Sequence, residues 1–81
     1  MDTKEKIRAF LVETFLFGKE DLDENTPLIE EHIIDSTGML EIIAFIERTF
    51  RVRIEDDEMI PENFNSIKSM ADYLGEKQVG G

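Results

Sequence analysis

An aspartate followed by a serine, Asp35-Ser36, stands where a polar stretch of the chain gives way to apolar residues at helical spacing. A hydroxyl there projects from the N-terminus of the predicted helix, beside backbone N–H groups without a partner in the helix and at the positive end of its dipole. Such a position stabilises a phosphate ester. The residues alone therefore allow two interpretations: a serine that bears a phosphate-linked group, or an ordinary capped helix start.

Catalytic and metal-binding interpretations of the polar residues find little support. The single histidine, His32, precedes Ser36 by four residues, and Asp35 is adjacent to the serine, so we expect no Ser-His-Asp arrangement and interpret His32 as a solvated loop residue. The segment 21–25 begins like a calcium-binding EF-hand, but glycine is missing at the sixth position of that loop and glutamate at the twelfth. We expect neither a catalytic residue nor a metal site.

The charge of the chain narrows the class of partner. Nineteen acids against nine Lys and Arg give a net charge of −10, which argues against binding to nucleic acid. No Lys or Arg lies between Lys19 and Arg48, and Ser36 falls inside this acidic interval. We expect the interval to attract basic surfaces of partner proteins, the alternative being an ordinary solvated acidic face.

The length and composition predict one domain over residues 1–81. The chain has no cysteine, so neither a disulfide framework nor a cysteine nucleophile is expected. It has no apolar run long enough to span a bilayer, and its first residues do not resemble a secretory signal. We expect a cytoplasmic monomer with no membrane insertion.

The spacing of apolar residues predicts an all-α fold, a small bundle of three main helices plus a short extra helix. The expected elements are helices over 4–17, 36–50 and 66–76, an extended link over 51–54, and a helical turn over 56–60 that Pro61 ends. A long first loop, 18–35, joins the first two helices, and its apolar residues predict that it wraps the bundle. The expected N-caps are Asp2 or Thr3, Asp35, and Asn65 or Ser66, and the expected helix-ending glycines are Gly18, Gly75, Gly80 and Gly81.

Taken together, these features resemble the acyl carrier proteins. The resemblance rests on Thr26-Pro27-Leu28, Ile33-Ile34-Asp35-Ser36, Glu41-Ile42-Ile43 with Glu47, and the run from Phe50 to Glu58. It implies that Ser36 bears a 4′-phosphopantetheine arm, attached by a phosphopantetheinyl transferase that uses coenzyme A, with Asp35 as its neighbour in the motif. It also implies a carrier without catalytic activity of its own, which passes thioester-linked acyl groups between enzymes of fatty acid, lipid or polyketide biosynthesis.

The resemblance implies two further sets of residues. Enzymes with basic docking surfaces are expected to contact Thr37, Met39, Glu41 and Glu47. The candidates to line a cavity for the acyl chain are Leu40, Ile43, Phe45 and Ile46, although ordinary core packing also explains apolar residues at this spacing.

Three positions depart from the common housekeeping carriers, which have leucine and then usually an acid after the serine. Here these residues are Thr37 and Gly38, and Arg48 replaces a second acid after Glu47. A glycine in the first turn predicts a looser helix start. We therefore expect a specialised, free-standing carrier. The alternatives are a carrier of aminoacyl or peptidyl groups and, in a different class, an unmodified acidic helical adaptor for a basic protein.

Overall fold

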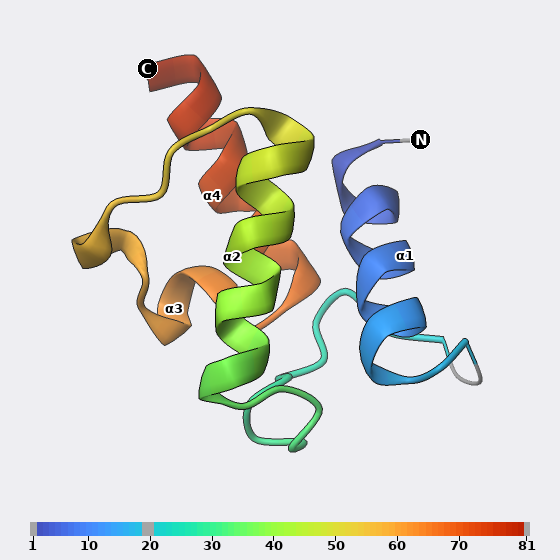
Figure 1. Ribbon diagram of the computed structural model, residues 1–81. Coiled ribbons are helices and arrows are strands. Elements are labelled where there is room, and N and C mark those ends of the chain that lie inside the picture. The colour runs from blue at the N-terminus through green and yellow to red at the C-terminus, as the bar shows by residue number, and fades with distance from the viewer. Residues whose placement is uncertain (1, 19–20, 81) are drawn as a thin grey trace.

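The structure is a computed structural model that describes residues 2–18 and 21–80, all of it helix and connecting loop (Figure 1). Its elements are α1 (Thr3–Phe15), α2 (Ser36–Phe50), the short 3₁₀ helix η1 (Asp56–Glu58), α3 (Pro61–Phe64) and α4 (Ile67–Gly80). The predicted all-α fold of three long helices and a short extra one is confirmed. Lys19 and Glu20, at the start of the acidic interval, and Gly81, one of the expected helix-ending glycines, lie outside the described residues.

Helix α1 begins as expected and ends two residues earlier than predicted. The Asp2 carboxylate accepts a hydrogen bond from the N–H of Glu5 at 2.8 Å, which caps the first turn. At the other end, Phe17 and Gly18 have φ values of 56° and 72°. Left-handed residues turn the chain away from the helix axis, and the N–H of Gly18 closes the turn on the carbonyl of Val12 at 3.0 Å.

Helix α2 has the predicted bounds, because a side-chain cap and a left-handed residue delimit it. Asp35 is its N-cap, and Arg51, with φ 55°, ends it. The following link, 51–54, has no regular secondary structure, as expected, and Ile54 is buried. The Glu47 carboxylate accepts the N–H of Ile54 at 2.9 Å and ties the link back to the helix.

The prediction that Pro61 ends a helical turn is wrong. The turn at η1 already stops at Glu58, and Pro61 is the first residue of α3. Proline has no N–H to donate, but the first residues of a helix have no acceptor for that group anyway, so proline is well placed there. Proline disrupts the interior of a helix, but Pro61 stands at the first position of α3, where it is tolerated.

Helix α4 starts at its predicted cap and runs further than predicted. The N–H of Ser69 donates to the Ser66 hydroxyl at 3.0 Å, so Ser66 is the capping residue. The helix continues past Gly75 to Gly80. A glycine inside a helix costs only about 1 kcal/mol relative to alanine, which does not stop a helix whose neighbours are packed.

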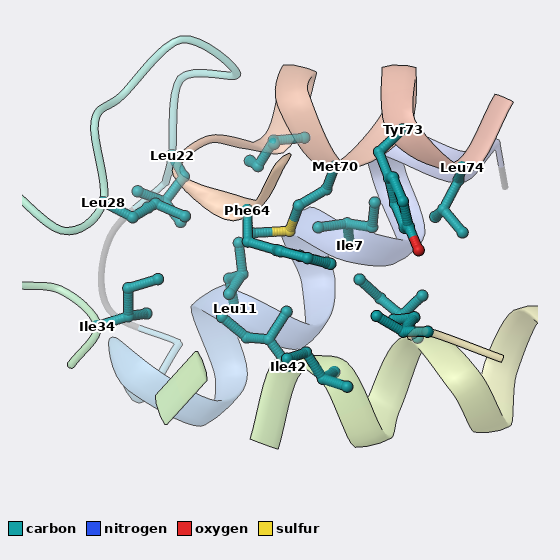
Figure 2. Packing of buried hydrophobic residues seen from close by; sticks show 14 residues of the cluster. Ile7, Leu11, Leu22, Leu28, Ile34, Ile42, Phe64, Met70, Tyr73 and Leu74 are labelled. Carbon is teal, nitrogen blue, oxygen red and sulfur yellow. The ribbon is translucent and has the colours of Figure 1, made fainter. Parts of the chain in front are cut away.

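The core is one cluster of buried apolar side chains between α2 on one side and α4 on the other, with α1 and α3 completing it (Figure 2). Its members are Ile7, Leu11, Leu22, Leu28, Ile34, Ile42, Ile43, Ile46, Ile54, Phe64, Ile67, Met70, Tyr73 and Leu74. Three of them, Leu22, Leu28 and Ile34, come from the long loop, which confirms that the loop wraps the bundle. The N–H of Leu28 also donates to the carbonyl of Asn65 at 2.8 Å.

Among the described residues, none of the helices has both the length and the apolar character that a membrane crossing requires.

Candidate functional site

Ser36 is the first residue of α2 and is exposed. The cap of this helix comes from its neighbour: the Asp35 carboxylate accepts the N–H of Gly38 at 2.8 Å, and the Asp35 carbonyl accepts the N–H of Met39 at 2.8 Å. The aspartate therefore stabilises the helix start, and the serine hydroxyl is not needed for that purpose. A group joined to this hydroxyl would lie beside the free N–H groups of the first turn.

A pocket of about 620 Å³ opens beside Ser36. Its walls come from the end of the long loop, the first two turns of α2, and the segment between η1 and α3. The lining residues are Ile29, His32, Ile34, Asp35, Ser36, Met39, Leu40, Ile43, Met59 and Pro61. Most of these side chains are apolar, so the pocket offers an apolar wall with a short polar rim at the serine.

The four candidates for an acyl cavity lie in three different surroundings. Leu40 and Ile43 line the pocket beside Ser36. Ile46 is fully buried in the core. Phe45 faces α1, where its ring stacks on that of Phe10 with centroids 4.1 Å apart. The structure therefore brings two of the four to the pocket and places the other two elsewhere.

The four candidates for partner binding also differ in exposure. Thr37 and Glu41 are exposed, whereas Met39 is half-buried and lines the pocket. Glu47 is half-buried, and one of its carboxylate oxygens is engaged by the N–H of Ile54. Of the two acids, Glu41 is the one that the structure presents on the open surface.

Gly38 is buried rather than loosely placed. A Cβ atom at this position would come within 3.0 Å of Cε1 of Phe15, the last residue of α1. The glycine therefore lets the end of α1 pack closely on the first turn of α2. The looser helix start predicted from its sequence is replaced by a close contact that supports the turn bearing Ser36.

A hydrogen-bonded group centred on Glu58 joins η1 to α3 and to α4. The Glu58 carboxylate accepts from Nζ of Lys77 at 2.8 Å and from the N–H of Glu55 at 2.9 Å, and the Glu58 carbonyl accepts from Asn63 at 2.9 Å. The hydrogen bond from Lys77, together with that from the Glu55 N–H, keeps the pKa of Glu58 below its ordinary value. The same bond raises the pKa of Lys77.

Sequence reasoning did not identify the pocket residues outside α2, namely Ile29, His32, Ile34, Met59 and Pro61. Helical periodicity identifies residues that share a face of one helix. The three loop residues lie outside any helix, and Met59 and Pro61 lie more than twenty positions after Ser36, so the folded chain is needed to bring all five to one pocket. No local pattern in the sequence could have identified them.

Comparisons with known proteins agree on one family. The family model described as the phosphopantetheine attachment site matches residues 5–74. The chain is 35% identical over 66 residues to the probable acyl carrier protein PigG of Serratia, covering 80% of this chain and 76% of that one. It is 33% identical over 57 residues to acyl carrier protein AsbD of Bacillus anthracis, covering 70% and 63% of the two chains.

A solved structure also has this fold. One chain in a crystal structure described as that of an FAD-dependent dehydrogenase superposes with a TM-score of 0.75 and 35% identity. The superposition covers 84% of this chain and 97% of the other. The matching chain is therefore about as small as the domain described above.

Proposed function

We propose that this chain, which belongs to the acyl carrier protein family, bears its 4′-phosphopantetheine on Ser36 and passes acyl groups between biosynthetic enzymes. The match over residues 5–74 and relatives that are 35% and 33% identical place it in the family. The family's cofactor is covalent 4′-phosphopantetheine. When bound, it supplies the terminal thiol that holds an acyl group as a thioester, a thiol that a chain without cysteine does not have.

One observation carries the choice of Ser36: its hydroxyl is exposed at the start of α2, while Asp35 alone provides the side-chain cap. A phosphate ester on this oxygen would be stabilised by the N–H groups of the first turn. By contrast, the hydroxyls of Ser66 and Ser69 lie 2.9 Å apart in the cap of α4, where they hydrogen bond to each other. Ser36 therefore fits the group better than those two serines.

The pocket beside Ser36 supports an acyl cargo. Its volume of about 620 Å³ lies within the range of small-molecule sites, about 300–1,000 Å³. We assign Leu40 and Ile43 to the wall that an acyl chain would contact, and we leave Phe45 and Ile46 to the core. An apolar wall favours a hydrocarbon cargo over a charged aminoacyl one, since charged groups lose hydration there.

The exposed face of α2 is the surface that we assign to partner enzymes. Thr37 and Glu41 lie there near Ser36, and an acidic face attracts basic docking surfaces. The small chain in the crystal structure of an FAD-dependent dehydrogenase favours a flavoenzyme of this kind among the partners. In this proposal the carrier is a cytoplasmic monomer that contributes no catalytic residue, and catalysis belongs to its partners.

The test is the intact mass after incubation with coenzyme A and a broad-specificity phosphopantetheinyl transferase. We expect wild type and Thr37→Ala to gain one phosphopantetheinyl unit and Ser36→Ala to gain none. Circular dichroism should show that Ser36→Ala is folded, because the cap on Asp35 is intact. No gain in wild type, with this transferase and with one from the source organism, would favour the unmodified acidic adaptor.

A further inference from the structure

A phosphate on Ser36 would enter a strongly acidic part of the chain. No Lys or Arg occurs between Lys19 and Arg48 in the sequence, and Asp35 is adjacent to the serine. Among the residues that the structure describes, those that line the pocket include no Lys or Arg either. One lining side chain is of a type that can carry a positive charge, and this is the sole histidine of the chain, His32.

The position of His32 on the pocket rim is fixed by a tight turn. Its own N–H donates to the carbonyl of Ile29 at 3.1 Å, and the N–H of Ile33 donates to the carbonyl of Leu28 at 2.9 Å. His32 has φ 58°, a left-handed conformation that histidine and asparagine adopt more readily than most residues. Leu28 and Ile34 are buried on either side of the turn. The imidazole is exposed, and it lines the same pocket as Ser36.

The charged side chains beside His32 are carboxylates. Within residues 2–18 and 21–80, Asp35 is the one other titratable side chain that lines the pocket, and its carboxylate is engaged by the N–H of Gly38. Glu31 is exposed beside His32 in the turn, and Glu30 accepts a hydrogen bond from the Asn65 amide at 2.8 Å. The wall opposite contributes Met59 and Pro61, which have no charge.

We propose that the imidazolium of His32 is a positioning group that pairs with the phosphodiester on Ser36 and holds the prosthetic arm at the pocket rim. The inference rests on the proposed function, because it requires the phosphate on Ser36. The physical reason is local charge: the phosphate adds a negative group to an acidic neighbourhood, and His32 is the pocket residue able to compensate for it. The contact requires the charged ring, because a neutral imidazole lacks the positive charge that the phosphate attracts.

The test is ³¹P NMR of the phosphopantetheinylated protein across about pH 5 to 8, the range in which histidine ordinarily changes charge. A phosphodiester remains singly ionised there, so an inflection in its chemical shift reports a neighbouring group. We expect an inflection in wild type and its loss in His32→Asn, since asparagine keeps the left-handed turn without the charge. Glu31→Gln is the matched control and should keep the inflection.

Three results would overturn the inference. A flat ³¹P titration in the modified wild type would show that the charge of His32 does not affect the phosphate. An inflection that persists in His32→Asn would assign the contact to another group. If intact mass and peptide analysis show that Ser36 bears no phosphate, the proposed function and this inference both fail, whereas a flat titration of modified Ser36 removes only the inference.

Discussion

The two ends of α2 are built in opposite ways. At its start, Ser36 is exposed, and Leu40, one turn further on, has 63% of its surface open to solvent. At its end, Phe45 stacks on Phe10 of α1 and meets the ring of Phe50 edge to face, with centroids 6.3 Å apart. The Glu47 carboxylate closes the following link onto the helix. The start of α2 thus leaves apolar surface open beside Ser36, whereas its end packs on α1 and on the following link.

This difference shows how a small domain can leave apolar surface unburied at the place where we propose that it binds a cargo. Burial of a leucine side chain stabilises a fold by about 1.5–3 kcal/mol, and most of this is not realised at Leu40. The packing of Phe45 on Phe10 and the buried core residue Ile46 hold α2 in place instead. The start of α2 can then present Ser36 and the pocket without loss of the helix.

The largest expected effect on stability comes from shortening a buried side chain of α2, compared with shortening an exposed one. Ile46→Ala should lower the free energy of unfolding by about 2–5 kcal/mol, because it leaves a cavity in the core. Leu40→Ala should change it by less than about 0.5 kcal/mol, because the side chain is mostly exposed. Urea unfolding of the unmodified protein measures both. Equal losses would contradict the distinction between the open and the buried face.

The next effect concerns the cap at the start of α2. Asp35→Ala removes the acceptor for the N–H of Gly38 and should destabilise the protein by about 1 kcal/mol. For a domain of this size, that corresponds to a fall of about 4–8 °C in the melting temperature. Asp35→Asn keeps a capping oxygen and serves as the control. If both variants melt like wild type, Asp35 is not what holds the start of α2.

The two acids predicted for partner binding, Glu41 and Glu47, should differ in what their substitution changes: docking for Glu41 and stability for Glu47. Glu47→Ala should lose about 1 kcal/mol of stability, because the N–H of Ile54 loses its acceptor, and Glu47→Gln should recover most of it. Glu41→Lys should leave stability within about 0.5 kcal/mol of wild type and slow modification by the transferase. Thermal melts and initial rates of mass gain measure the two effects. If Glu41→Lys lowered stability and the Glu47 variants slowed modification, docking would be assigned to the end of α2 instead of its start.

The smallest effect is the pH dependence of the hydrogen bonds at Glu58. Hydrogen bonds from Lys77 and from the Glu55 N–H hold the pKa of Glu58 below its ordinary value, so its contribution to stability is present above the ordinary pKa of a glutamate and is lost as pH falls through the lowered value. Glu58→Gln should therefore lower the melting temperature at pH 7 and do so less at pH 3. An equal difference at both pH values would contradict this assignment.

The sequence predicts those parts of the fold that local chemistry specifies. The bounds of α2 follow from Asp35 and from an apolar period that runs to Phe50. Pro61 led to a wrong prediction, because a proline can either follow the end of a helix or stand in its first turn, and the residue type alone does not distinguish the two. Gly38 also led to a different expectation, a looser helix start, because its contact with Phe15 joins residues more than twenty positions apart in the sequence.

The same limit applies to the site. Ser36 and Asp35 are identifiable because their chemistry is local to one helix start. The opposite wall of the pocket contains Met59 and Pro61. These residues come after α2 in the chain, and their position beside Ser36 depends on how α2 and α4 pack, which no local sequence pattern reveals. Leu40 and Phe45 both fit an apolar period, and the stacking of Phe45 on Phe10 decides which of them faces the pocket.

The central claim is that Ser36 bears the prosthetic arm, and fragmentation mass spectrometry of the modified protein tests it most directly. Trypsin cuts after Lys and Arg, so residues 20–48 form one peptide, whose hydroxyls on Thr and Ser are those of Thr26, Ser36 and Thr37. We expect the fragment series to place the entire phosphopantetheinyl mass on Ser36. That mass on Thr26 or Thr37, or in a different peptide, would contradict the account.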